Sequence, residues 1–325
     1  MAQKAPKVSI IIVNWNSGEH LKRCLGAVNR QTLKPYRIII IDNSSDYTPD
    51  EKHSGQNTIE IIRPGKNIGF AAASNLGAEK STDCDWIALL NPDAFPESNW
   101  LENLIASAEK YPEFSFFGSR LIRSDEPSIL DGVADHYHTS GLAWRYKHGC
   151  RQSSNENTHR EIFSPCAAAA LYRKDAFFDA GGFDQQYFCY LEDVDLGFRL
   201  RLLGYRCLYV PDAVVRHVGS SSTGKHSDFT IYHGHRNIVW TFFKNMPLVL
   251  LIYYLPQHLL LNIVTLAWFS LQGRWAVIFR AKYDAIADIP QILVKRREIQ
   301  KQRRVKSYEI IRHMAVGPLA VFKRS

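Results

Sequence analysis

The chain has 325 residues, a hydrophobic content of 46% and a formal net charge of +8. A chain of this length can bury a sizeable core, so it needs neither a disulfide framework nor a structural metal to fold. Its six cysteines are scattered without a C-x-x-C pair, which argues against both and indicates a reducing compartment. No long apolar stretch follows the first lysines, so we predict no secretory signal and a cytosolic location.

The first 125 residues alternate between two kinds of segment. Apolar runs without polar alternation begin at Val8, Tyr36, Thr58 and Asp85, and helix-like segments such as GEHLKRCLGAVNRQ and NWLENLIASAEKY separate them. Long runs rich in β-branched residues are typical of strands buried on both faces, and their alternation with helices is typical of a parallel sheet. We therefore predict an α/β fold in which ligands bind at the carboxyl ends of the strands.

Polar, turn-forming residues follow each apolar run. They read NWN (14–16), DNSSD (42–46), RPGKNIGF (63–70) and NPDA (91–94). Such residues are common in any turn or helix cap, so a single loop of this kind has little weight. Four such loops at one edge of a sheet favour a ligand site.

Two strand ends offer candidate metal ligands. Asp93 stands in LLNPDA at the end of one predicted strand, and His217 ends a later one, YRCLYVPDAVVRH. A carboxylate held rigidly at a sheet edge suits a hard cation such as Mg²⁺ or Mn²⁺ that bridges phosphates, and imidazole also binds Mn²⁺. The alternative is that both are structural residues, which is the more common case for a lone histidine on a strand.

The loop after His217, GSSSTGKH (219–226), nearly matches the phosphate-binding signature G-x-x-x-x-G-K-[ST]. His226 stands where that signature needs a hydroxyl, and the loop comes late in the chain, so we expect no P-loop ATPase. Backbone amides of this loop and Lys225 could still contact a diphosphate. The chain contains no G-x-G-x-x-G and no G-x-S-x-G, so neither a nicotinamide enzyme nor a hydrolase triad is supported.

Three carboxylates open a predicted amphipathic helix in YLEDVDLGFRLRLLGY, namely Glu192, Asp193 and Asp195. Acidic groups in a first turn stabilise the helix dipole by about 0.3–1 kcal/mol each. Asp195 can also pair with Arg199, four residues further on. From these residues alone a helix start is the favoured interpretation, because a catalytic function would require a substrate hydroxyl nearby.

Two further regions differ in character from the rest. Residues from about Asp125 to Arg160 are irregular and rich in polar and small residues, and we predict a long surface excursion there. Between Asn245 and Gly273 there is no Asp, Glu, Lys or Arg, and we expect Pro256 to divide this stretch into two apolar segments, 248–255 and 259–271.

Neither apolar segment alone has the roughly 20 residues of a spanning helix. Seven basic residues and a single glutamate follow in KRREIQKQRRVK (295–306). We therefore predict an in-plane or re-entrant helical pair with its basic tail on anionic headgroups. The alternative is a buried helical hairpin that packs on the sheet domain or on a second subunit.

The order of the motifs is informative in itself: VSIIIVNWN, IIIDNSSD, NIGFAAASN, LLNPDA, YLEDVDLGFRLR and VRHVGSSS. In this order they resemble the family 2 glycosyltransferases, and most of all their rhamnosyltransferase-like branch. The resemblance covers Val8 to Pro247. It implies a GT-A fold, with a catalytic domain over 1–245 and a membrane-associating segment over 246–325.

The resemblance also implies an activity and its site. The activity is inverting transfer of a sugar such as rhamnose from a dTDP- or UDP-sugar to a hydroxyl, with Mg²⁺ or Mn²⁺ at the diphosphate. Asp93 and His217 would hold the metal, although Asn91 occupies the first position of the family's D-x-D motif. Asp193 would be the general base, and Glu192 would hold the base or the acceptor. The residues implied around the donor are Asn14, Asn16, Asp42, Asn67, Gly69, Asn75 and Arg236.

The C-terminal tail resembles that of relatives acting on polyprenyl-linked saccharides at the cytoplasmic face of the bacterial inner membrane. The implied partners are the nucleotide-sugar donor, a polyprenyl-linked saccharide acceptor and an anionic membrane surface, which the protein would bind as a peripheral or monotopic protein. Nucleic acid is not among them, and a homodimer is left open. The alternative function is an inactive nucleotide-sugar-binding membrane adaptor.

Overall fold

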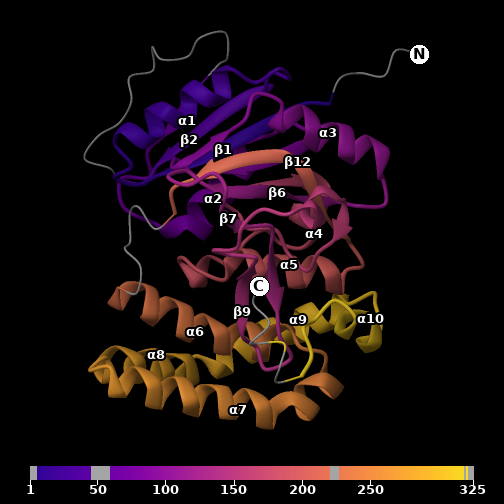
Figure 1. Cartoon of the computed structure of the whole chain (residues 1–325). Coiled ribbons are helices and arrows are strands. Elements are labelled where there is room, and N and C mark those ends of the chain that lie inside the picture. The colour runs from indigo at the N-terminus through magenta and orange to yellow at the C-terminus, as the bar shows by residue number, and fades with distance from the viewer. Residues whose placement is uncertain (1–5, 45–58, 220–226, 318–319, 321–325) are drawn as a thin grey trace.

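The computed structural model describes residues 6–44, 59–219, 227–317 and 320. Figure 1 shows a central sheet flanked by helices, with a further layer of helices below it. The main path of the ten-stranded mixed sheet runs β10-β12-β6-β11-β4-β1-β2-β3. Strands β3, β2, β1 and β4 are parallel, whereas β11 is antiparallel to both β4 and β6. The predicted α/β fold with a mostly parallel sheet is confirmed.

The strands within the described residues are β1 Val8–Asn14, β2 Arg37–Asp42, β3 Ile59–Ile62, β4 Trp86–Leu90, β5 Ala94–Pro96, β6 Phe116–Arg123, β7 Leu130–Gly132, β8 Ala134–Tyr137, β9 Ala143–Tyr146, β10 Arg160–Glu161, β11 Ala169–Arg173 and β12 Cys207–His217. The α-helices there are α1 Glu19–Asn29, α2 Gly69–Lys80, α3 Trp100–Lys110, α4 Lys174–Asp179, α5 Glu192–Leu202, α6 Asp228–Asn245, α7 Leu248–Leu271, α8 Trp275–Ala287, α9 Ile289–Gln302 and α10 Ser307–Ile311.

The core has two sides because successive side chains of a strand point to opposite faces. On β1, Ile10 and Ile12 pack with residues of α1 and α3, whereas Ile11 packs with α2 on the other face. Both faces of the strand are therefore buried, which explains its unbroken apolar sequence. The carboxyl ends of the parallel strands remain as the polar edge of the sheet.

The prediction of a surface excursion over Asp125 to Arg160 is wrong for its central part. Residues 130–141 are buried apart from the partly exposed His136, and they supply β7 and half of the β8-β9 hairpin. β7 pairs with Leu121 and Ile122 near the end of β6, a strand inside the main sheet, and Asp135 bridges to Ser164. The polar residues that made this segment look exposed turn inward to bind one another.

Helix α7 corrects a second expectation. It runs without a break from Leu248 to Leu271 with Pro256 inside it, so the proline does not divide it into two segments. Among the described residues, α7 is the one helix long and apolar enough to cross a membrane, with a mean hydropathy of 1.6, yet only 11% of that window is buried. The rest of the chain therefore covers only one face of α7, the face that carries the buried Leu250 and His258.

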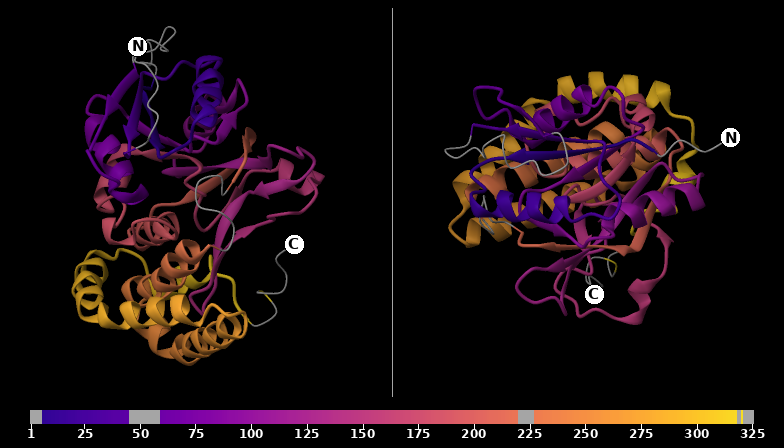
Figure 2. Two further views of the ribbon diagram at one scale, coloured as in Figure 1. Left: turned by 90° about the vertical axis from the view of Figure 1, so that its left-hand side faces the viewer. Right: turned by 90° about the horizontal axis from the view of Figure 1, so that it is seen from above.

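The lower helical layer, which consists of α6 to α10, is anchored to the sheet half, which consists of the strands and α1 to α5 (Figure 1 and Figure 2). At its centre Asp195 pairs with Arg199 and with Lys244, whose ammonium also lies 2.6 Å from Asp184. Lys295 of α9 contacts the same Asp184 carboxylate at 2.6 Å. Asp195 and Lys244 are almost completely buried, so salt screens their attraction little, and the partly exposed Lys295 extends the network to α9. The predicted pair of Asp195 with Arg199 is confirmed.

Candidate active site

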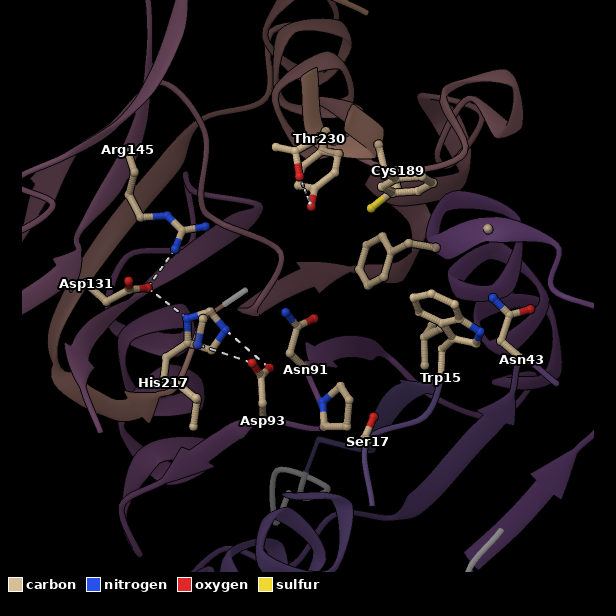
Figure 3. A pocket seen from close by; sticks show the side chains of 18 of the residues that line it. Trp15, Ser17, Asn43, Asn91, Asp93, Asp131, Arg145, Cys189, His217 and Thr230 are labelled. Carbon is tan, nitrogen blue, oxygen red and sulfur yellow. Dashed lines mark hydrogen bonds and ion pairs between the residues drawn. The ribbon is translucent and has the colours of Figure 1, made fainter. Parts of the chain in front are cut away.

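A cavity of about 940 Å³ lies at the carboxyl ends of β1, β2, β4 and β12 (Figure 3). One wall comes from residues after β1 and β2 and from the start of α2. A second comes from β4, β7, β9 and β12, and a third from the segment before α5 and the start of α6. The lining residues used below are Trp15, Asn43, Asn67, Gly69, Asp93, Asp131, Arg145, Phe188, Cys189, Tyr190, His217, Phe229 and Thr230.

Asp93 and His217 meet at the sheet edge, as the strand ends predicted. His217 Nε2 lies 3.3 Å from Asp93 Oδ1, and its Nδ1 lies 2.8 Å from Asp131 Oδ2. Burial opposes a charge on the imidazole, but the carboxylates of Asp131 and Asp93 outweigh it and raise the pKa of His217 to about 9. Arg145 Nη1 binds the same Asp131 oxygen at 2.6 Å.

This pair fits a divalent ion. His217 Nε2 is buried and faces Asp93 Oδ1 at 3.3 Å, so a divalent ion that replaced the imidazolium proton would meet one nitrogen and one oxygen ligand. Neighbouring oxygen or nitrogen ligands of one octahedral ion, each about 2.1 Å from it, lie about 3 Å apart, close to the observed separation. Asp131 orients the imidazole from behind, as a carboxylate commonly does for a metal-bound histidine.

The wall near β1 and β2 is held by two asparagines. Asn43 Nδ2 donates to Asn67 Oδ1 at 2.8 Å, and Asn43 Oδ1 accepts from the Ile68 amide. Asn67 Oδ1 also accepts from the Gly69 amide at the start of α2. Gly69 has a φ of 80°, and a Cβ there would lie 2.6 Å from the Phe188 ring, so only glycine allows this approach.

The other residues predicted around the donor do not line the cavity. Asn14 Nδ2 donates to Asp42 Oδ1 at 3.3 Å, and both are buried behind the wall. Asn16 is exposed with a φ of 50°. Asn75 forms two hydrogen bonds with the backbone of Phe183. Arg236 donates to the carbonyls of Gln186 and Tyr187.

The acidic start of α5 divides between two environments. Asp195 turns toward α6, whereas Asp193 accepts hydrogen bonds from the Ala167 and Val194 amides at 3.1 and 2.9 Å. Glu192 is buried, and its Oε2 has no hydrogen-bond partner within the described part of the chain. Burial and the neighbouring charge of Asp193 raise the pKa of Glu192 well above its usual value.

Asp193 lies in a cluster with Asp135 and Cys166, whose side-chain ligand atoms are all within 4.8 Å of one another. Burial and the charge of Asp193 raise the pKa of Asp135 well above its usual value. Arg145 donates to Cys166 Sγ at 2.7 Å and lies 3.9 Å from Asp135. Because this guanidinium already supplies a positive charge, the cluster fits a metal less well than the Asp93 and His217 pair does.

The sequence prediction missed Trp15, Asn43, Asp131, Asp135 and Arg145. Trp15 and Asn43 stand inside quoted strand-end motifs, so their position could have identified them. Asp131 and Asp135 stand in DGVADHYH, where the close spacing of acidic and histidine residues was a usable signal. The predicted contact of the 219–226 loop and Lys225 with a diphosphate lies outside the described residues except for Gly219, whose amide donates to Asp93 Oδ2.

Comparisons with known proteins agree with this geometry. Residues 9–179 match the family described as glycosyl transferase family 2, which is more than half of the chain. The N-acetylglucosaminyl-diphospho-decaprenol L-rhamnosyltransferase of Mycobacterium tuberculosis is 30% identical over 241 residues, which cover 66% of this chain and 77% of the relative. The chain therefore belongs to glycosyl transferase family 2, and it is a glycosyltransferase.

Solved structures agree on the fold. S. aureus TarS 1-349, in complex with UDP-GlcNAc, gives a TM-score of 0.56 at 15% identity over 94% of this chain and 89% of that chain. GalNAc-T7, solved with UDP, GalNAc and Mn²⁺, gives a TM-score of 0.58 at 17% identity over 74% of this chain, which spans about half (48%) of that protein. The fold is that of the GT-A glycosyltransferases.

Proposed function

We propose that this glycosyltransferase moves rhamnose or a similar sugar, with inversion, from a nucleotide-diphosphate donor to a hydroxyl of a lipid-linked saccharide in surface polysaccharide biosynthesis. The observation that carries the proposal is the Asp93 and His217 pair, which faces the same cavity as Asn43 and Asn67. The M. tuberculosis relative acts, by its name, on a diphospho-decaprenol carrying N-acetylglucosamine.

The donor would be a dTDP- or UDP-sugar that extends from the Asn43 wall to the sheet edge. Trp15 supplies an aromatic surface for the nucleoside, and Asn14 and Asp42 support this wall from behind. Asp93 and His217 would hold Mg²⁺ or Mn²⁺, which neutralises the charge that grows on the leaving diphosphate. Asn16, Asn75 and Arg236 would then support donor binding without contacting the donor, because they lie outside the cavity lining.

Asp193 would be the general base. In an inverting transfer the acceptor oxygen attacks the anomeric carbon opposite the leaving diphosphate, and its proton passes to a carboxylate on that side. Two backbone amides fix the Asp193 carboxylate, which is the rigidity that such a base needs. Glu192 stands beside it and would hold the base or the acceptor.

The apolar face of α7 and α8 would rest on the membrane. Exposed on it are Leu248, Val249, Ile252, Tyr253, Leu259, Leu260, Ile263, Val264, Trp268, Leu271, Trp275, Phe279 and Tyr283. Arg274 and Arg280 are exposed beside these residues and could meet anionic headgroups. We therefore propose a peripheral or monotopic protein with α7 in the plane of the cytoplasmic face of the inner membrane.

The test is a panel of dTDP- and UDP-sugars incubated with the protein, Mg²⁺ or Mn²⁺ and a short-chain N-acetylglucosaminyl-diphospho-lipid, with nucleotide diphosphate release as the readout. Asp193→Asn should abolish release but leave donor binding intact, whereas Asp212→Asn, at an exposed carboxylate on β12, should change neither. Donor binding without release by the unmodified protein would instead identify the inactive adaptor.

A further inference from the structure

The segment just before α5 has an unusual backbone. Phe188, Tyr190 and Leu191 have φ values of 64°, 70° and 62°, a region that non-glycine residues seldom occupy. Such conformations persist only where surrounding structure holds them, and they concentrate at ligand sites. The strain therefore points to a function for the side chains that this segment presents.

Two residues of α6 hold the segment in place. Asn237 is fully buried, and its Nδ2 lies 3.1, 3.0 and 2.8 Å from the carbonyl oxygens of Tyr187, Cys189 and Tyr190. Arg236 binds the preceding carbonyls, and the Phe188 carbonyl accepts from the Ala71 amide of α2. The segment is thus fixed from two sides.

The side chains so fixed form an aromatic wall, which we define as Phe188, Tyr190 and Phe229. All three line the cavity. Phe229 lies 6.1 Å from both other rings, and His233 packs on Phe188 and Phe229 from behind. The Tyr190 hydroxyl and Thr230 Oγ1 are 3.3 Å apart and give this wall a polar rim. Apolar ring faces next to a few placed hydroxyls are the usual composition of a site for a ligand with both apolar and polar edges.

We propose that the aromatic wall is the binding site for the acceptor's sugar ring, whose C–H face would stack on Tyr190 and Phe229. This inference rests on the function proposed above. Tyr190 stands in the segment that leads into α5, the helix whose first turn carries the candidate base Asp193. Figure 3 places Thr230 and Cys189 across the cavity from Asp93 and Ser17, away from the candidate metal ligands.

The connection of the wall to the lower helices supports the acceptor over the donor. Phe229 and Thr230 open α6, which binds α8 through Tyr232 and Asp284 at 2.6 Å. Asp228 also pairs with Arg274 in the turn between α7 and α8. The wall therefore stands between the sheet edge and the helices that carry the exposed apolar face, where a lipid-linked saccharide would enter.

The test compares Tyr190→Phe, Tyr190→Ala and Phe229→Ala with Tyr36→Ala, an exposed aromatic at the far end of β2. The readouts are transfer to a short-chain N-acetylglucosaminyl-diphospho-lipid, hydrolysis of the donor by water, and binding of UDP and dTDP with Mn²⁺. Both alanine variants at the wall should raise the KM for the lipid probe about tenfold or more, with donor hydrolysis and nucleotide affinity unchanged. Tyr190→Phe keeps the ring and should show a smaller rise.

An unchanged KM for the probe in Phe229→Ala would overturn the proposal, and so would an equal loss of nucleotide affinity. If the unmodified protein transfers nothing, the proposed function fails, but the wall is still tested by saturation-transfer NMR of the lipid probe. Contact of the probe's sugar protons with the unmodified protein, lost in Phe229→Ala and kept in Tyr36→Ala, would support the wall. Absence of such contact would refute it.

Discussion

The sheet half of the molecule and its lower helical layer distribute polar residues in opposite ways. In the sheet half, Ile10 and Ile38 are fully buried, and polar side chains gather at the cavity edge. In the lower layer, His258 of α7 is 1% exposed and binds the Ser140 carbonyl, whereas Ile263 and Trp268 of the same helix are 64% and 60% exposed. An apolar face of this kind costs free energy in water at about 25 cal/mol per Å², so the two halves are built for different surroundings.

The largest expected effect concerns the sheet edge. Asp93→Ala and His217→Ala should each lower transfer about a thousandfold, because the cation that offsets charge on the leaving diphosphate would be lost. The matched control is Glu97→Gln, which lies between β5 and α3 and pairs with Arg216 on the outside of the sheet. Steady-state kinetics at varied Mn²⁺ concentration measures the effect. If the His217 variant is as active as the unmodified protein, transfer does not depend on a metal ion at this pair.

The joint between the two halves is the next target. Lys244→Met should lower the free energy of unfolding by about 3–5 kcal/mol, because it leaves Asp184 and Asp195 buried without their shared cation. Urea denaturation measures the change, with Lys22→Met, at an exposed lysine of α1, as the control. A loss below about 1 kcal/mol would mean that the joint does not depend on these charges.

The same joint predicts a dependence on pH. Burial alone would raise the pKa of Asp184 and of Asp195. Lys244 and Lys295 outweigh burial at Asp184, and Arg199 and Lys244 outweigh it at Asp195, so the pKa of each carboxyl is lowered. The pKa of each carboxyl is therefore lower in the folded protein than in the unfolded chain, where it is about 3.9. The stabilisation is complete at pH values above about 3.9 and is lost as the pH falls toward the folded pKa. Denaturation between pH 6 and 3 should show this loss, and in Asp195→Asn it should be smaller.

The exposed face of the lower layer gives a smaller effect on binding. Leu260→Glu with Ile263→Glu should weaken binding to anionic vesicles about tenfold or more, because two charges would enter the apolar interface. Phe178→Glu, at an exposed phenylalanine on α4, is the control. Flotation with anionic and neutral vesicles measures this, and unchanged flotation would show that membrane contact lies elsewhere.

These point variants are sharper than a deletion of residues 246–325. Arg296 of α9 donates to the carbonyls of Phe243 and Met246, and Lys295 binds Asp184. Removing the whole segment would therefore also remove contacts that hold the end of α6 and Asp184. Whether the domain boundary at 245 separates two independent units stays a prediction.

The sequence predicted those features that follow from local periodicity. Uninterrupted apolar runs located β1, β2 and β4, and strand-end positions located Asp93 and His217. It could not locate Arg145, because the charge of this residue reads as surface until its ion pair with the buried Asp131 is known. It also misplaced Pro256, since tertiary contacts such as His258 with Ser140 hold α7 together across a residue that alone would break a helix.

The central claim is that one cavity holds a nucleotide diphosphate and a divalent ion at the sheet edge. A crystal structure with Mn²⁺ and either UDP or dTDP, with anomalous data at the manganese edge, tests it most directly. We predict one anomalous peak between Asp93 and His217. The diphosphate of the nucleotide should lie beside this peak, and its nucleobase should lie toward Asn43 and Trp15. A peak at Asp135, Cys166 and Asp193 instead, or a nucleotide bound outside this cavity, would contradict it.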